Sequence, residues 1–281
     1  MAFVASLVVA CAVCGAAEKS LPSNGSEIAF EGRKRATVEM RGASFSTASR
    51  DLDLVELRAQ PGLSVAVGKS SMVGADVPIL HRSLTLRAGE ARSATTLGDV
   101  DLHLSHTGWR SAPSTTSSRF MVSVGAKLPT APLELDPAGE QVHPDLQPGC
   151  GSVAPYLGAT HAWSSSLWSA WVSGSFLMPV SVRTGAHPGS SLRGSLTLQL
   201  QPTRAFATRA SVLGRFDARG AIDDEVVARS GGASMHLASE LVFSPTTDVV
   251  IGAGASFPVV QEMRGYRGTS PIVLASLGVD F

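Results

Sequence analysis

Two stretches of the chain carry serine, histidine and acidic residues at close spacing, the residue types of a hydrolytic triad. The first contains Asp99, Asp101, His103 and Ser105, and the second contains Ser234, His236 and Glu240. A triad is defined by geometry rather than by nearness in sequence. A serine-rich chain with seven histidines also produces such spacings by chance. We therefore predict that the protein is not an enzyme.

Metal and cofactor binding have little support in the sequence. His103 and His106 fall on opposite faces of an extended segment, and Cys150 has no partner at the spacing of metal ligands. The acidic run Asp223–Glu225 is best explained as a solvated loop face. No glycine-rich phosphate loop stands between a strand and a helix. The prediction is no metal and no cofactor.

The composition excludes several classes of protein. Lys and Arg total 23 and Asp and Glu total 23, so the neutral chain has no electrostatic footprint for nucleic acid. Only 16% of the residues are charged, against 44% hydrophobic, which is unlike soluble disorder. No uncharged apolar run reaches the ~18 residues of a membrane-spanning helix. A globular protein or a membrane protein built from alternating strands remains.

Side-chain character alternates with a period of two along most of the chain. In Ser191–Gln201, for example, Leu192, Leu196 and Leu200 share one face and Arg193 lies on the other. Segments of this kind are about 10 residues long, the length of a tilted strand that crosses a bilayer. Twelve are expected near residues 36–46, 51–59, 63–73, 97–107, 118–128, 153–163, 167–178, 191–201, 205–216, 232–244, 247–257 and 271–281. The fold class is therefore predicted as all-β, a transmembrane antiparallel β-barrel of about 12 strands.

The links between these segments alternate in length. Tight turns are expected at Gln60–Gly62, Ser164–Ser166, Pro202–Arg204 and Pro245–Thr246. Long links are expected at 74–96, 129–152, 179–190, 217–231 and 258–270. Short turns on one side and long loops on the other are typical of bacterial outer-membrane barrels. The long loops are expected outside the cell, and Gly108–Ser117 is an exception, since it is long where a short link is expected.

The amino terminus resembles a secretory leader. Residues 1–17 are uncharged and apolar and end in small residues, which predicts a signal peptide. Residues 18–35 form a loose segment, and residues 36–281 form the barrel. A second interpretation of the leader, a lipoprotein box that makes Cys11 a lipid anchor, remains open.

The carboxyl terminus ends on an alternating apolar strand. One face of Pro271–Phe281 consists of Val273, Ala275, Leu277, Val279 and Phe281. A terminal aromatic residue after such an alternation resembles the signal by which barrel assembly machinery recognises outer-membrane proteins. We therefore expect the bacterial outer membrane as the location, with its lipids and the assembly machinery as partners.

The face opposite the apolar one carries the charges of the barrel. It is predicted to line a pore with Lys127, Arg193, Arg209, Arg215, Asp99, Asp101 and Glu240. Opposite charges on different walls would orient polar solutes in a water-filled lumen. The same charges could instead pair with each other and plug the interior. Twelve strands lie between filled and open barrels in size, so both alternatives remain.

Three motifs resemble a known barrel family. They are Thr96–Val100, Gly125–Thr130 and Leu146–Ser152, which read TLGDV, GAKLPT and LQPGCGS. The chain from Leu97 to Trp163 is similar through them to the outer-membrane transporters of the phenol meta-degradation pathway. The family usually has a small hydroxyl residue where Cys150 stands. The resemblance implies a barrel that passes hydrophobic or aromatic compounds.

The function expected from the sequence is passage of small solutes, hydrophobic or aromatic ones included, across the outer membrane. A non-conducting barrel that presents its loops at the cell surface is the main alternative. A lipid-modifying barrel enzyme is the third, and it conflicts with the predicted faces, because both triad-like sets would point into the lumen.

Overall fold

The structure is a computed structural model of the chain. It describes residues 34–47, 52–111, 116–139, 142, 146–181, 186–222, 225–264, 266–268 and 271–281. The predicted signal peptide at 1–17, and the predicted loose segment apart from its last two residues, lie outside this part. No helix in the described residues is long and apolar enough to cross a membrane.

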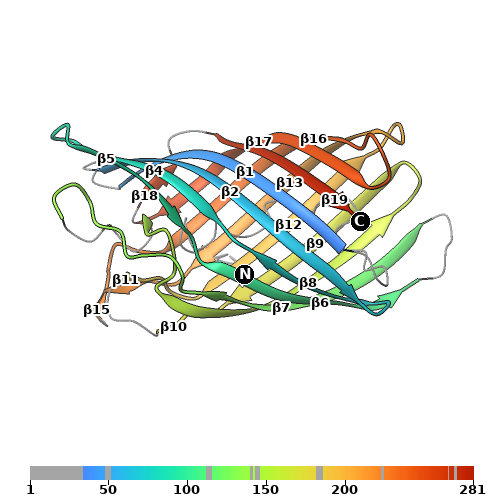
Figure 1. The fold of residues 1–281 in the computed structure, drawn as a ribbon, viewed down its shortest axis with the longest axis horizontal. Helices are drawn as coiled ribbons and strands as arrows, with labels where there is room; N and C mark the ends of the chain where they lie inside the picture. The colour runs from blue at the N-terminus through green and yellow to red at the C-terminus, as the bar shows by residue number, and fades with distance from the viewer. Residues whose placement is uncertain are drawn as a thin grey trace, which may run out of the picture.

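All regular structure in the described part of the chain is β-strand, and most of it closes into one antiparallel barrel (Figure 1). The long strands are β1 (Lys34–Thr47), β2 (Leu52–Val67), β3 (Ser71–Asp76), β4 (Ile79–Leu86), β5 (Ala91–Leu97), β6 (Val100–Arg110), β7 (Ser117–Leu128), β8 (Ser152–Ser164), β9 (Trp168–Leu177), β12 (Ser191–Leu200), β13 (Phe206–Asp217), β16 (Gly232–Phe243), β17 (Val249–Met263) and β19 (Ile272–Asp280). The short ones are β10 (Val180–Ser181), β11 (Ala186–His187), β14 (Ala221–Ile222), β15 (Glu225–Val226) and β18 (Tyr266–Gly268).

The wall has twelve positions around its circumference, as the alternation predicts. Their order is β1, β2, β3, β6, β7, β8, β9, β12, β13, β16, β17 and β19. The first and last strands close the ring, with Arg35 opposite Asp280 and Gly42 opposite Val273. Lys34 and Phe281 also exchange two backbone hydrogen bonds of 2.9 Å. The barrel therefore leaves no open edge between its first and last strands, the arrangement that spares a membrane barrel unpaired backbone groups.

The predicted strand positions are wrong between residues 51 and 96. β2 runs unbroken through the predicted turn at Gln60–Gly62, and the chain turns instead after Val67, at Gly68, whose φ is 71°. The predicted long link at 74–96 contains β4 and most of β5. Pro61 is tolerated inside a strand because it lies where the neighbouring ladder is interrupted, and its carbonyl accepts from Val77 N at 2.9 Å.

Two of the twelve wall strands are therefore broken in the middle. β3 and β4 continue one another beside β2 in a single register, with an interruption at Val77 and Pro78. β5 and β6 continue one another beside them, with an interruption at Gly98 and Asp99. Beyond these breaks the β4–β5 hairpin extends past one end of the barrel, while short turns gather at the other end near the C-terminus (Figure 1).

The two faces of the wall differ as the alternation predicts. Large apolar side chains point outward all around the barrel, including Met40, Leu57, Leu102, Leu157, Leu196, Leu241 and Val273. Polar and charged side chains are buried inside, including Thr37, Glu56, Arg58, Ser64, Thr197, Gln199 and Ser256. An apolar outer belt with a polar interior is the pattern of an outer-membrane barrel.

Candidate functional site: the barrel interior

All seven residues predicted to line a pore point into the barrel. Six of them are at most 9% exposed: Asp99, Asp101, Lys127, Arg193, Arg209 and Glu240. The side chain of Arg215 is 18% exposed. The six that stand in strands share the face of their strand that is opposite to its outward apolar residues, such as Leu102, Leu192 and Leu241. Pore lining itself stays a prediction, because several of these groups bind other parts of the protein.

Near the end with the short turns, one arginine ties three neighbouring strands together. Arg209 of β13 donates from Nη1 to Glu240 Oε2 of β16 at 2.8 Å and from Nη2 to Gln199 Oε1 of β12 at 2.9 Å. Its guanidinium carbon lies 5.6 Å from the ring centre of Trp171 on β9. Glu240 also faces Gly252, where a Cβ atom would lie 2.3 Å from its carboxylate oxygen. These contacts fill this level of the lumen and stiffen the wall.

Asp99 has a role that the sequence did not reveal. It lies in the interruption between β5 and β6, and its carboxylate accepts from the backbone N–H groups of Ala131, at 3.1 Å, and of Cys150. Next to it, Thr130 Oγ1 donates to the Gly98 carbonyl at 2.8 Å and accepts from Val100 N at 3.0 Å. Asp99 therefore fastens both ends of the segment between β7 and β8 to the broken strand.

Asp101 and Lys127 lie opposite each other on β6 and β7. The hydroxyl of Tyr156 on β8 donates to Asp101 Oδ1 at 2.8 Å, so the aspartate has a neutral partner as well as a cationic neighbour. The Tyr156 ring packs directly against Gly125. A Cβ atom added to Gly125 would lie only 2.5 Å from the Cζ atom of this ring. Gly125 is therefore needed for close approach of this ring to the wall.

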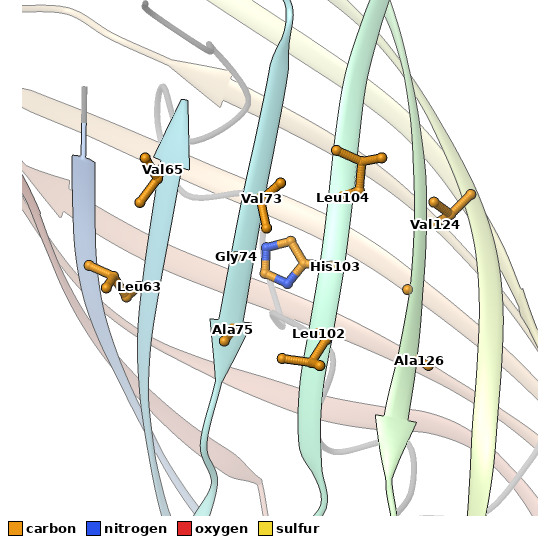
Figure 2. A pocket seen from close by; sticks show the side chains of 11 residues that line it. Leu63, Val65, Val73, Gly74, Ala75, Leu102, His103, Leu104, Val124 and Ala126 are labelled. Carbon is orange, nitrogen blue, oxygen red and sulfur yellow. The ribbon is translucent and has the colours of Figure 1, made fainter. Parts of the chain in front are cut away.

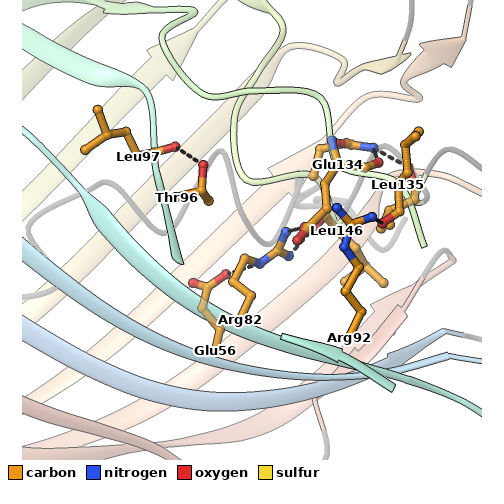
Figure 3. A network of polar contacts seen from close by, with 10 residues as sticks. Glu56, Arg82, Arg92, Thr96, Leu97, Glu134, Leu135 and Leu146 are labelled. Carbon is orange, nitrogen blue, oxygen red and sulfur yellow. Dashed lines mark hydrogen bonds and ion pairs between the residues drawn. The ribbon is translucent and has the colours of Figure 1, made fainter. Parts of the chain in front are cut away.

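Part of the segment between β7 and β8 folds into the barrel, while the prediction that the loop 129–152 belongs to the outer side of the membrane stays a prediction. Arg82 of β4 is fully buried and binds this segment in two places, at the Glu134 carboxylate and at the Leu146 carbonyl (Figure 3). Its Nε also lies 3.1 Å from Glu56 Oε2 on β2. One guanidinium thus joins the wall to the loop through its planar fork of donors.

Further contacts fix the described part of this inward segment, residues 129–139, 142 and 146–151. Gln147 donates to the carbonyls of Glu134 at 3.0 Å and of Val142 at 2.6 Å, and it accepts from Glu134 N at 2.8 Å. An apolar cluster covers it, made of Phe45, Leu52, Leu54, Leu84, Val142, Leu146 and Met263. Burial of so many apolar groups inside a lumen otherwise lined with charges makes this level an apolar plug.

The histidines of the two triad-like sets each contact a residue outside their set. His103 Nδ1 lies 3.5 Å from Asp76 of the adjacent β3. In the second set, Glu240 is bound by Arg209, and His236 lies 3.5 Å from Ser256 instead. Among the described residues, no group of three or more His, Cys, Asp or Glu side chains could hold a metal ion.

The outer face carries a groove of ≈ 670 Å³ over β2, β3, β6 and β7. It is lined mainly by aliphatic side chains such as Leu63, Val73 and Leu104, with His103 beside Gly74 in its floor (Figure 2). A Cβ atom added to Gly74 would lie 2.4 Å from the His103 ring. Glycine at this position therefore leaves the space that the imidazole occupies.

No protein-family model matches the sequence. No curated protein matches it significantly. Solved structures do match: the crystal structure of the COG4313 outer membrane channel from Pseudomonas putida F1 has a TM-score of 0.72 at 11% identity, covering 92% of this chain and 98% of that one. The chain has the fold of an outer-membrane channel.

Two further solved structures are less similar. The transport unit of the autotransporter AIDA-I from Escherichia coli has a TM-score of 0.52 at 7% identity, with 91% of each chain covered. The CymD monoaromatic hydrocarbon channel has a TM-score of 0.41 at 8% identity, covering 89% of this chain and 88% of that one. The first of these structures confirms the predicted barrel class.

Proposed function

We propose that this barrel lies in the bacterial outer membrane and passes small, predominantly hydrophobic solutes. The observation that carries the proposal is the match over nearly the whole length of the COG4313 outer membrane channel. The outward apolar belt supports the membrane location, because such a surface is unstable in water. The function proposed is therefore that of a transporter-like barrel.

The interior supports a hydrophobic solute better than a water-filled pore. A diffusion pore for polar solutes keeps its charges in water, whereas six of the seven predicted lining residues are at most 9% exposed. Aliphatic and aromatic groups form a continuous cluster at the end away from the short turns. A solute that displaces part of this cluster replaces one apolar contact with another, so little solvation free energy is lost.

The same burial favours a second candidate, a non-conducting barrel that presents its loops at the cell surface. Arg82 and Arg209 each cross-link separate elements inside the lumen. If neither network opens, the lumen stays closed. The two candidates differ in whether any solute crosses.

Uptake into whole cells tests the choice, because the lipopolysaccharide leaflet slows hydrophobic compounds. Cells that produce the barrel should take up a radiolabelled monoaromatic compound such as toluene several-fold faster than cells with an empty vector. Liposomes that contain the purified barrel should stay impermeable to sugars. Rapid sugar passage without faster toluene uptake would favour a polar pore, and no passage of either solute would favour the structural barrel.

The location has its own test at the carboxyl terminus. The five residues of the proposed assembly signal lie on β19 and just after it, and Val273, Leu277 and Phe281 are exposed on the outer face. Phe281→Asp keeps the backbone bonds to Lys34, so it should cut recognition by the assembly machinery without removing a strand contact. We expect a sharp loss of heat-modifiable barrel in outer-membrane fractions with unchanged synthesis. Unchanged assembly would remove the assembly-signal assignment.

A further inference from the structure

The apolar groove on the outer face follows two lipid-facing rows of side chains across four strands (Figure 2). Register places one row across β2, β3, β6 and β7, made of Val65, Val73, Leu104 and Val124. The next outward row, on the side of the long loops, is Leu63, Ala75, Leu102 and Ala126. Ala75 and Ala126 are smaller than their aliphatic neighbours, so the surface is hollowed between them.

A hydrogen-bonded polar pair follows the groove on the side of the short turns. Ser71 and His106 lie opposite each other on β3 and β6, one outward row beyond Val73 and Leu104. Ser71 Oγ and His106 Nδ1 are 2.9 Å apart. When the hydroxyl donates to Nδ1, the ring proton is on Nε2, which can donate to an acceptor on the lipid side. Lys69, exposed in the turn two residues before Ser71, adds a cationic group at the same rim.

Aromatic side chains beside this pair mark the height of the membrane interface. Trp109 lies opposite Phe120, and Phe120 lies opposite His161, in the next outward row. The His161 ring stacks on Trp163 with 4.3 Å between ring centres, and its Nε2 is 2.7 Å from Ser118 Oγ. Aromatic girdles flank the apolar band of outer-membrane barrels at both interfaces. The Ser71–His106 pair therefore lies close to the level at which lipid headgroups begin.

The outer face thus combines two kinds of surface that one lipid molecule can satisfy. A polar group without a hydrogen-bond partner is unfavourable in an apolar environment, and acyl chains have neither donors nor acceptors. A phosphate oxygen can accept from His106 Nε2, and the charge of Lys69 strengthens such an interaction. Short turns are expected on the periplasmic side of the membrane. The leaflet on that side consists of glycerophospholipids.

We propose that the outer face over β2, β3, β6 and β7 binds one glycerophospholipid. An acyl chain lies in the groove, and the phosphate lies at His106 and Lys69. Trp109 borders the headgroup on the side of the short turns. The site is outside the lumen, so this inference goes beyond the proposed function and is independent of whether the lumen conducts.

Native mass spectrometry of the purified barrel in a non-ionic detergent tests the inference. The probes are dioleoylphosphatidylglycerol and dioleoylglycerol, which share their acyl chains and differ in the phosphate headgroup. The native barrel should retain one phosphatidylglycerol molecule and bind it about tenfold more tightly than dioleoylglycerol, because only the first lipid offers a charged acceptor. Equal binding of the two lipids, or preferential retention of lipopolysaccharide, would overturn the inference.

Replacement of the polar groups separates headgroup binding from chain binding. His106→Leu combined with Lys69→Gln should weaken phosphatidylglycerol binding to the level of dioleoylglycerol and leave dioleoylglycerol unchanged. His81→Leu is the matched control, because His81 Nδ1 is 3.0 Å from Thr95 Oγ1 in a similar exposed pair that does not line the groove. This control should bind phosphatidylglycerol like the native chain. An equal loss in the control, or no loss in the double variant, would contradict the headgroup assignment.

Ala126→Phe tests the groove itself, because the larger ring fills the place of the acyl chain. Both lipids should bind several-fold more weakly, while the heat-modifiable migration of the folded barrel stays native. Ala75→Phe, from the other side of the groove, should give the same result and provides a second variant if the first does not assemble. Native binding of both lipids by either folded variant would show that no acyl chain occupies the groove.

Discussion

The two arginine networks inside the barrel are built from similar groups but connect different kinds of element. Arg209 binds Glu240 and Gln199, which stand on the strands at either side of its own. Arg82 binds Glu134 and Leu146, which lie 52 and 64 residues away in the inward segment. The first network holds neighbouring strands to each other, whereas the second holds a loop inside the wall. Loss of the first should therefore weaken the barrel, and loss of the second should release the loop.

The largest effect is expected at Arg209. Arg209→Gln leaves Glu240 buried without its cationic partner, which costs about 3–5 kcal/mol of folding free energy. Urea unfolding in phospholipid vesicles, followed by tryptophan fluorescence, measures this loss. Arg209→Gln with Glu240→Gln should recover most of it. If the single variant is as stable as the native barrel, the network does not stiffen the wall.

A charge on the outer face should have a somewhat smaller effect. Leu196 is 53% exposed on the lipid side of β12, and Leu196→Arg should cost about 2–4 kcal/mol near the membrane centre. The readout is the heat-modifiable fraction in isolated outer membranes. Arg193→Gln, on the inward face of the same strand, is the control and should assemble normally. If Leu196→Arg assembled normally and Arg193→Gln did not, the assignment of the lipid-facing and inward faces of the wall would be wrong.

Arg82 tests the second network, which holds the segment between β7 and β8 inside the wall. In Arg82→Gln the Glu134 carboxylate can turn to water as the segment leaves the lumen, and the buried Glu56 keeps the attraction of Arg41, so we expect less loss of stability than in Arg209→Gln. Ion conductance in planar bilayers should rise several-fold, because the apolar plug loses Val142 and Leu146. Arg92→Gln is the control. Arg92 donates a long hydrogen bond of 3.4 Å to the Leu135 carbonyl, so its replacement should leave the conductance like that of the native barrel. Unchanged conductance in Arg82→Gln would mean that the segment is fixed by its other contacts.

The smallest effect is expected at Thr130. Thr130→Val removes the hydroxyl that bridges Gly98 and Val100, at a cost of about 1 kcal/mol. Limited proteolysis near Gly139, which is exposed at the tip of the segment, should become faster while barrel stability changes little. Equal cleavage rates for the variant and the native chain would indicate that Asp99 alone holds this end.

The sequence by itself determined the regular part of the fold. From β7 to β19 the long wall strands and the short turns follow from alternation, because a period of two fixes which side chain meets lipid and which meets the interior. The prediction ended β17 too early, since this strand runs to Met263 inside the expected link 258–270, and it missed the short strands β10, β11, β14, β15 and β18. The same rule placed Arg193, Arg209 and Glu240 on the inward face, whereas the pairing of Arg209 with Glu240 and Gln199 appears only in the structure. The count of twelve wall positions was correct, although the predicted strands between residues 51 and 96 were misplaced.

The tertiary structure alone decided the irregular part. Pro61 and Gly62 read as a turn, yet they lie within β2, because the ladder beside them is interrupted by Pro78. Asp99, whose pore lining stays a prediction, holds the two ends of the segment between β7 and β8, a role that its place in the alternation does not indicate. Nothing in the local pattern indicates that Arg82 meets Leu146, since their contact depends on where a long loop closes. Alternation reports only which face a residue occupies, so contacts across the lumen become visible only when the wall is closed.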